Sequence, residues 1–199
     1  MTDSIADHGA FSGEPKAIWL STGGAPDRDM QLIEAFWFRD QMSVEWLAPE
    51  GSVVNGASIP KALWSSVGSP YTGDYRRASI VHDLACIDAQ GDSGKRRAAD
   101  RMFYHACRAG GCSTLEATIL YVGVRIGAHQ NSVAAWRSDA PELARPQIYR
   151  TLSAKRIEAA FQLTAELVLA GGEIDDAEEI ERRTDEALST VAGFDLRNR

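Results

Sequence analysis

The sequence has few cysteines, few basic residues and no long apolar run, and each shortage excludes a class of protein. Three cysteines in 199 residues, with no CxxC spacing, argue against a zinc-binding or disulfide-stapled fold, so we expect reduced thiols. The formal net charge of -7 argues against a nucleic-acid-binding protein, which must neutralise phosphates with a basic face. No apolar segment approaches the roughly 18 residues that a membrane-spanning helix needs.

The first residues are also poor in structural signals. Residues 1–15 are polar and have no pattern that could bury one face, so we expect a flexible segment in which His8 has no role. The same stretch lacks the basic-then-apolar plan of a signal peptide, and we therefore expect a cytoplasmic protein.

The chain does contain 44% hydrophobic residues, which is enough to build a core. Three segments between residues 17 and 49 are rich in aromatic and aliphatic residues and are separated by turn-forming residues, which predicts a small antiparallel sheet. We expect its aromatic side chains to pack in the core; if they were exposed together, they would form a surface for a membrane or a partner. These side chains belong to Trp19, Phe36, Trp37, Phe38 and Trp46.

The pattern after the sheet is helical. Residues 51–75, rich in Gly, Ser and Pro, predict an ordered loop, and Asp74 is a candidate N-cap for a helix that ends near residue 87. A second helix over residues 95–109 should end at the glycine pair that follows it.

A capping box formed by Ser113 and Glu116 starts a third helix, which we expect to end near residue 127. The sequence therefore predicts an α+β fold, mostly α, in which a small N-terminal sheet precedes a pair of antiparallel helices and a third helix.

The remaining residues predict a helical appendage. Two amphipathic helices over residues 153–170 and 176–191 are more typical of packing or homo-oligomerisation than of regulation. The predicted organisation is a flexible segment (1–15), a main domain (16–128), a linker (129–146) and the appendage (147–199).

The residues with the clearest chemical potential lie in the main domain. The helical period places His82 on the inward face of the first predicted helix, with Asp83 at the edge of that face. The carboxylate of Asp100, on the next helix, could accept a hydrogen bond from one nitrogen of His82 and leave the other nitrogen free as a base. Asp83, together with oxygens of Asn55 and Gly56, could hold a hard cation.

These residues also have ordinary structural interpretations. A buried histidine is more often a hydrogen-bonded core residue than a base, and a single His-Asp pair is common by chance. His105 is a second candidate ligand or base, although we expect it to be peripheral. Ser58 is not surrounded by a glycine elbow, so we expect a loop-capping hydroxyl, and His129 receives no role.

The segment VNGASIPKALWSSVGSPYTGDYRRASIVHDLAC resembles domain-of-unknown-function family 1353, a family of phage and bacterial proteins, and the resemblance extends over about residues 16–128. The same order of motifs is similar to that of the bacterial and fungal phospholipase A2 family. The matching positions here are Asn55-Gly56-Ala57, then His82-Asp83, then Asp100 to Tyr104, with an echo of a later motif in Tyr121 to Gly127.

The second resemblance implies a phospholipase A2-like domain. It implies that His82 activates water, that Asp100 orients His82, and that Asp83 binds calcium with oxygens of Asn55 and Gly56. The substrate would be a phospholipid at the inner face of the membrane, in a phage-lysis or antiphage-defence setting.

Two departures from the phospholipase pattern qualify what it implies. Asn55 stands where that family has an acid, which should lower the affinity for calcium. Ala57 and Ser79 replace a cysteine pair, as expected in a reducing compartment.

Two other functions fit the same residues. A non-catalytic binding or assembly protein of a phage or mobile element would use His82, Asp83 and Asp100 as a buried hydrogen-bonded network, and a ring sealed from solvent with no cleft beside it would favour this function. A metal-dependent phosphohydrolase would need further ligands, of which His105 alone is near, and it ranks last.

Overall fold

The computed structural model describes residues 7–20, 29–56, 59–60, 63–68, 72–89, 92–137 and 147–197. These residues form an α+β fold that is mostly helical, as the sequence predicts, with two small antiparallel sheets and six helices. The chain divides into two compact units: unit 1 comprises Met1–Ser58 and Pro70–Ala117, and unit 2 comprises Ile59–Ser69 and Thr118–Arg199. The candidate site lies in unit 1.

The strands of unit 1 form two sheets of three strands, where we expected one sheet. A bend at Ile33 and Glu34 divides the longest predicted strand into β3 and β4, which belong to different sheets. The first sheet has the order β1-β4-β5 (Ala10–Phe11, Phe36–Arg39, Glu45–Ala48), and the second has the order β2-β3-β6 (Ala17–Trp19, Met30–Leu32, Val53–Val54). β1 pairs with β4, although it lies in the segment that we expected to be flexible.

The aromatic side chains of the strands divide between core and surface. Phe36 and Phe38 are buried, as expected, whereas Trp37 and Trp46 are half-buried. Trp19 is 58% exposed, so the expectation of a core position is wrong for this residue.

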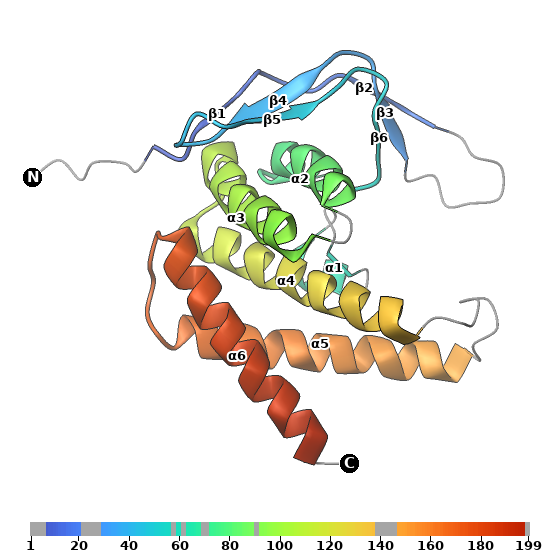
Figure 1. Ribbon diagram of the computed structural model, residues 1–199, viewed down its shortest axis with the longest axis vertical. Coiled ribbons are helices and arrows are strands. Elements are labelled where there is room, and N and C mark those ends of the chain that lie inside the picture. Colours follow the sequence, from blue (N-terminus) through green and yellow to red (C-terminus); the bar gives the residue numbers. More distant parts are fainter. Residues whose placement is uncertain are drawn as a thin grey trace, which may run out of the picture. The chain divides into compact units, whose positions relative to one another are not determined.

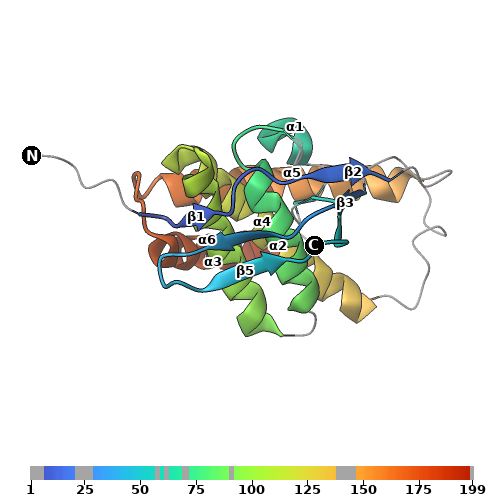
Figure 2. The same cartoon turned by 90° about the horizontal axis from the view of Figure 1, so that it is seen from above.

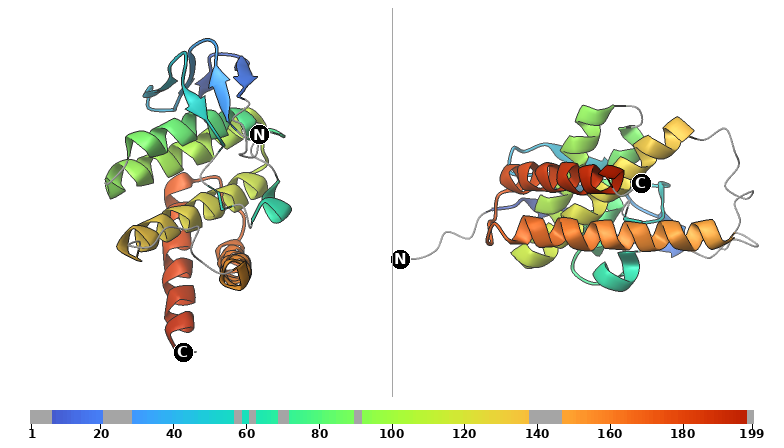
Figure 3. Two further views of the ribbon diagram at one scale, coloured as in Figure 1. Left: turned by 90° about the vertical axis from the view of Figure 1, so that its right-hand side faces the viewer. Right: turned by 90° about the horizontal axis from the view of Figure 1, so that it is seen from below.

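Beneath these strands, α2 (Arg76–Asp88) and α3 (Ser93–Gly110) form a helical hairpin (Figure 1), and the left view of Figure 3 shows both helices along their length. Figure 2 looks down on unit 1 from the strand side. The strands and the hairpin both contribute buried apolar side chains to the core of unit 1, and apolar packing of this kind holds elements together. These side chains include Leu32, Phe36, Phe38, Val54, Ala78, Val81, Ala99, Met102 and Phe103.

Capping residues determine where α3 begins and ends. The Asp92 carboxylate accepts hydrogen bonds from the N–H groups of Gly94 and Lys95, at 2.9 and 3.0 Å, and so caps the first turn. Gly111 ends the helix with a φ of 114°, which confirms the predicted glycine terminus. α2 begins after Tyr75 without a side-chain cap, so the predicted N-cap at Asp74 is wrong.

Unit 2 contains α1 (Trp64–Val67), most of α4 (Thr114–Arg137), α5 (Gln147–Leu169) and α6 (Ala177–Arg197). The predicted capping box is present before α4: the Glu116 carboxylate accepts from the Ser113 N–H at 2.8 Å, and the Ser113 hydroxyl accepts from the Glu116 N–H at 3.2 Å. α4 continues past residue 127 into the predicted linker, whose residues 138–146 lie outside the described part. α5 and α6, the two helices of the predicted appendage, pack against each other.

Two further observations concern the whole described chain. Cys86, Cys107 and Cys112 are free thiols, as expected. Among the described residues, no helix combines the length and apolar composition that would let it cross a membrane.

Candidate functional site

The helical hairpin brings His82 of α2 and Asp100 of α3 together. The His82 Nε2 atom lies 2.9 Å from the Asp100 Oδ1 atom, and both side chains have an exposed fraction of 0%. Both residues sit on the inward face of their helices, among the apolar side chains that hold the hairpin together. The predicted contact between imidazole and carboxylate is therefore formed.

A third residue, Arg96, places a positive charge beside Asp100. Its Nε atom lies 3.1 Å from Asp100 Oδ1, one helical turn away on α3, and its side chain is 17% exposed. A buried carboxylate is costly unless it is paired and hydrogen-bonded, and Asp100 has both kinds of partner. The sequence analysis missed Arg96, although its i, i+4 spacing from Asp100 was a usable signal.

Cys86 packs on the ring of His82. Its Sγ atom lies 3.4 Å from Nε2 and 3.7 Å from Nδ1. The sulfur is almost equally near to both ring nitrogens. In the ring plane it would collide with the carbon atom between those nitrogens, so it lies over the face of the ring. The Phe103 ring, with its centroid 4.6 Å from that of His82, also restrains the imidazole.

The second ring nitrogen of His82 has a different environment. Among the described residues, Nδ1 forms no hydrogen bond to a nitrogen or oxygen atom, and the Cys86 sulfur lies 3.7 Å from it over the ring face. If Nε2 carries the proton that Asp100 accepts, Nδ1 keeps a lone pair in the ring plane. Such a nitrogen can accept a proton from water.

The protonation of His82 depends on its neighbours. Burial disfavours the charged ring and lowers the pKa of His82, but the electrostatic interaction with Cys86 and the hydrogen bond to Asp100 raise the pKa to about 9. The ring is therefore protonated at neutral pH, and its base form becomes populated only as the pH approaches 9.

Asp83 binds the loop that precedes the hairpin. Its Oδ2 atom accepts a hydrogen bond of 2.7 Å from the backbone N–H of Asn55, and the backbone N–H of Gly56 donates to the same carboxylate. Gly56 has a φ of 102°, a conformation that favours glycine. Burial raises the pKa of Asp83, and the two N–H groups partly offset that rise.

The donors around Asp83 decide how well this position suits calcium. The sequence analysis expected oxygens of Asn55 and Gly56 beside Asp83, and the structure does bring this loop to Asp83. The contacts that it makes there are N–H groups, which fit an anion, whereas calcium needs six to eight oxygens. In this arrangement the described residues do not fit calcium.

A possible metal site is formed by three residues, His82, Cys86 and Asp100. Each offers one potential ligand atom, and the three atoms lie within 4.8 Å of one another. A cation there would compete for Asp100 Oδ1 with both His82 and Arg96, and the sulfur lies over the ring face instead of beside a ring lone pair. These contacts favour a hydrogen-bonded network over a metal centre.

The other candidate residues lie outside this network or outside the described chain. Ser79 is buried and donates its hydroxyl hydrogen bond to the Tyr75 carbonyl at 3.1 Å. His105 lies on α3 and contacts His8 instead of His82. Ala57 and Ser58 lie outside the described residues, so the predicted role of the Ser58 hydroxyl stays a prediction.

Comparison with known proteins gives relatives without an assigned activity. The chain is 35% identical over 118 residues to the uncharacterized protein y4jT of Sinorhizobium fredii (strain NBRC 101917 / NGR234), a match that covers 58% of this chain and 33% of y4jT. It is 33% identical over 99 residues to the uncharacterized protein y4iH of the same organism, covering 49% of this chain and 40% of y4iH. The chain therefore spans less than half the length of these curated relatives. No solved structure matches it.

The family comparison covers the whole candidate site. It matches residues 30–124, which include the Asn55 loop, the His82-Asp83 pair and Asp100. Over these residues the chain is similar to the family described as "Protein of unknown function (DUF1353)", which confirms the resemblance predicted from its motifs.

Proposed function

We propose that unit 1 is a hydrolase of carboxylic esters, of phospholipase A2 type, in which His82 is the general base and Asp100 is its positioning partner. The observation that supports this function is the 2.9 Å contact between His82 Nε2 and Asp100 Oδ1. It commits one ring nitrogen to a carboxylate and leaves Nδ1 to accept a proton from water.

The proposed reaction uses the ring as a proton shuttle. Nδ1 takes a proton from a water molecule, whose oxygen attacks the ester carbonyl carbon. The same proton then passes from Nδ1 to the leaving alcohol as the C–O bond breaks, so the ring returns to its starting state. Asp100 stabilises the imidazolium that exists between the two steps, and Arg96 donates a hydrogen bond to the same carboxylate oxygen.

The substrate class is supported by the order of the motifs and by the surface of unit 1. Several apolar side chains on and beside the strands are exposed, which is compatible with contact to a phospholipid membrane. They belong to Ile18, Trp19, Met42, Val44, Leu47 and Val53.

Calcium is implied by the phospholipase A2 resemblance. Because N–H donors face Asp83, no step of the proposed reaction depends on calcium, and calcium binding stays a prediction. A titration with calcium and with a chelator tests it separately from the base.

The test is release of fatty acid from phosphatidylcholine and phosphatidylglycerol vesicles by the full chain, with calcium and with chelator. We expect His82→Gln to lower the rate at least a hundredfold, because a general base contributes about 10²–10⁴-fold. His129→Gln is the matched control and should keep the wild-type rate. Equal rates for wild type and His82→Gln, or no release by the wild type, would contradict the proposal.

A second function is favoured by a specific observation, the 0% exposure of both His82 and Asp100. In a non-catalytic binding or assembly protein, His82, Asp100, Arg96 and Asp83 would serve as a buried network that fixes the hairpin and the Asn55 loop. Catalysis requires the ring to become accessible, so carbethoxylation of His82 separates the two functions. Modification of His82 in the folded chain supports the hydrolase, and complete protection supports the network.

A further inference from the structure

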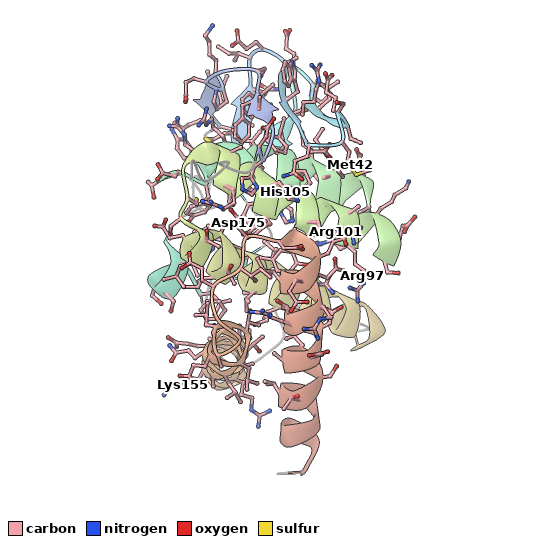
Figure 4. The ribbon with its side chains drawn as sticks, turned by 90° about the vertical axis from the view of Figure 1, so that its left-hand side faces the viewer. Met42, Arg97, Arg101, His105, Lys155 and Asp175 are labelled. Carbon is pink, nitrogen blue, oxygen red and sulfur yellow. The ribbon has the colours of Figure 1, made fainter. Side chains whose placement is uncertain are left out.

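A second pair of polar side chains in unit 1 is not used by the His82 site. His8, just before β1, and His105, on α3, place their Nδ1 atoms 3.1 Å apart. Figure 4 shows His105 on its helix. We expected no role for His8 and a peripheral position for His105. The contact between them could not be predicted, because residues 97 positions apart offer no local signal of contact.

The backbone around His8 is fixed in a way that holds its ring in place. Gly9 has a φ of 109°, and a Cβ atom there would lie 2.3 Å from the Arg39 carbonyl oxygen, so only glycine fits. β1 then pairs with β4, and the His8 side chain is 6% exposed. His8 is therefore a positioned residue and not part of a loose tail.

The side chain of His105 is also restrained. The Tyr104 ring lies edge-on to both imidazoles, with centroids 6.3 Å from His8 and 5.7 Å from His105. The two imidazole planes are tilted by 35°, with centroids 5.4 Å apart. The pair therefore has a defined geometry before any ligand binds.

At 3.1 Å, the two Nδ1 atoms cannot both carry a proton directed at the other. They either share one proton or share a cation. With metal–nitrogen bonds of about 2.0–2.1 Å, two nitrogens at this separation subtend an angle of about 98° at the metal. That angle lies between the square-planar and tetrahedral values.

We propose that His8 and His105 chelate one divalent transition-metal ion through their Nδ1 atoms, with water in the remaining positions. Imidazole nitrogens suit nickel, copper and zinc, whereas calcium and magnesium prefer oxygen, so the ligand is a transition-metal cation. The ion would tie the segment before β1 to α3, and it would do so independently of the His82 site.

The first test is calorimetric titration of the full chain, without a histidine tag, with nickel(II) at neutral pH. We expect one ion per chain, with the affinity lowered at least tenfold in both His8→Gln and His105→Gln and unchanged in His129→Gln. The proposal would be overturned if the wild type did not bind nickel(II), or if either His8→Gln or His105→Gln kept the wild-type affinity.

A second measurement needs no substitution and so does not depend on the variants folding. In the wild-type chain, paramagnetic nickel(II) should broaden the ring resonances of His8 and His105 at the lowest additions, before those of His82 and His129. Equal broadening of all four rings, or earlier broadening of His82 or His129, would refute the chelate.

Discussion

The Asp83 carboxylate accepts a hydrogen bond of 2.7 Å from the backbone N–H of Asn55. This contact joins α2 to the loop after β6, two segments that are 28 residues apart in the sequence. Asp83 therefore holds the loop in place next to the residue that carries the proposed base.

The first prediction concerns this anchor. Asp83→Ala leaves two backbone N–H groups without their acceptor, so we expect the free energy of unfolding to fall by about 1–3 kcal/mol. Urea denaturation measures that loss, and amide exchange at Asn55 and Gly56 should accelerate. Asp88→Asn, at an exposed acid on the same helix, is the matched control and should change neither quantity. Unchanged exchange in Asp83→Ala would show that the loop is held by other contacts.

Cys86 gives a second prediction, because its electrostatic interaction with the ring raises the pKa of His82. Cys86→Ala should lower that pKa from about 9 toward the ordinary value of 6.5. The base form would then be populated at neutral pH, and ester hydrolysis near pH 7 should become faster. Ring NMR and the pH–rate profile measure the two effects. An unshifted His82 resonance in Cys86→Ala, judged against Ile87→Ala on the same helix, would contradict this role for the thiol.

The stability of the protein should depend on pH through the same ring. The folded-state pKa of His82, about 9, lies above the 6.5 of an exposed histidine, so folding favours the protonated ring. Its stabilisation is therefore fully present below pH 6.5 and is lost as the pH rises through about 9. We expect the free energy of unfolding to fall by up to roughly 3 kcal/mol across this window. Urea denaturation of the wild type and of Cys86→Ala should show a smaller fall in the variant, and an equal fall in both would contradict the assignment.

Arg96 provides a test of the charge balance. Arg96→Gln removes the cation whose Nε atom lies 3.1 Å from Asp100 Oδ1, a buried carboxylate oxygen that also contacts His82. We expect the pKa of His82 to rise further and the free energy of unfolding to fall by about 1–3 kcal/mol. Lys95→Gln, at the exposed neighbouring position, should leave both unchanged. A His82 pKa that stays constant in Arg96→Gln would show that Arg96 does not act on the pair.

Part of this structure could be predicted because its signals are local. The capping box at Ser113, the glycine end of α3 and the inward position of His82 all follow from helical periodicity and capping rules. The contact between His82 and Asp100 followed from two helices joined by a short turn.

The rest could not be predicted because it depends on contacts between distant segments. The strands divide into two sheets, and α2 contacts strands of both; such long-range packing is not encoded by the residues of short strands. The pairing of His8 with His105 requires knowledge of where β1 lies. Asn55 and Gly56 direct their backbone N–H groups, not oxygen atoms, toward Asp83. That orientation depends on backbone dihedral angles, which cannot be read from the residue types alone.

The most direct test of the hydrolase is to compare the pH dependence of catalysis with the titration of one ring. The kcat/KM for a phospholipid ester would be measured from about pH 6 to pH 10, and the His82 ring would be titrated by ¹⁵N NMR in the same buffers. The proposal predicts that the two midpoints coincide near pH 9, the folded-state pKa of His82, and that both move together in Cys86→Ala. A rate whose midpoint stays fixed while that of the His82 ring moves would contradict the assignment of His82 as the base.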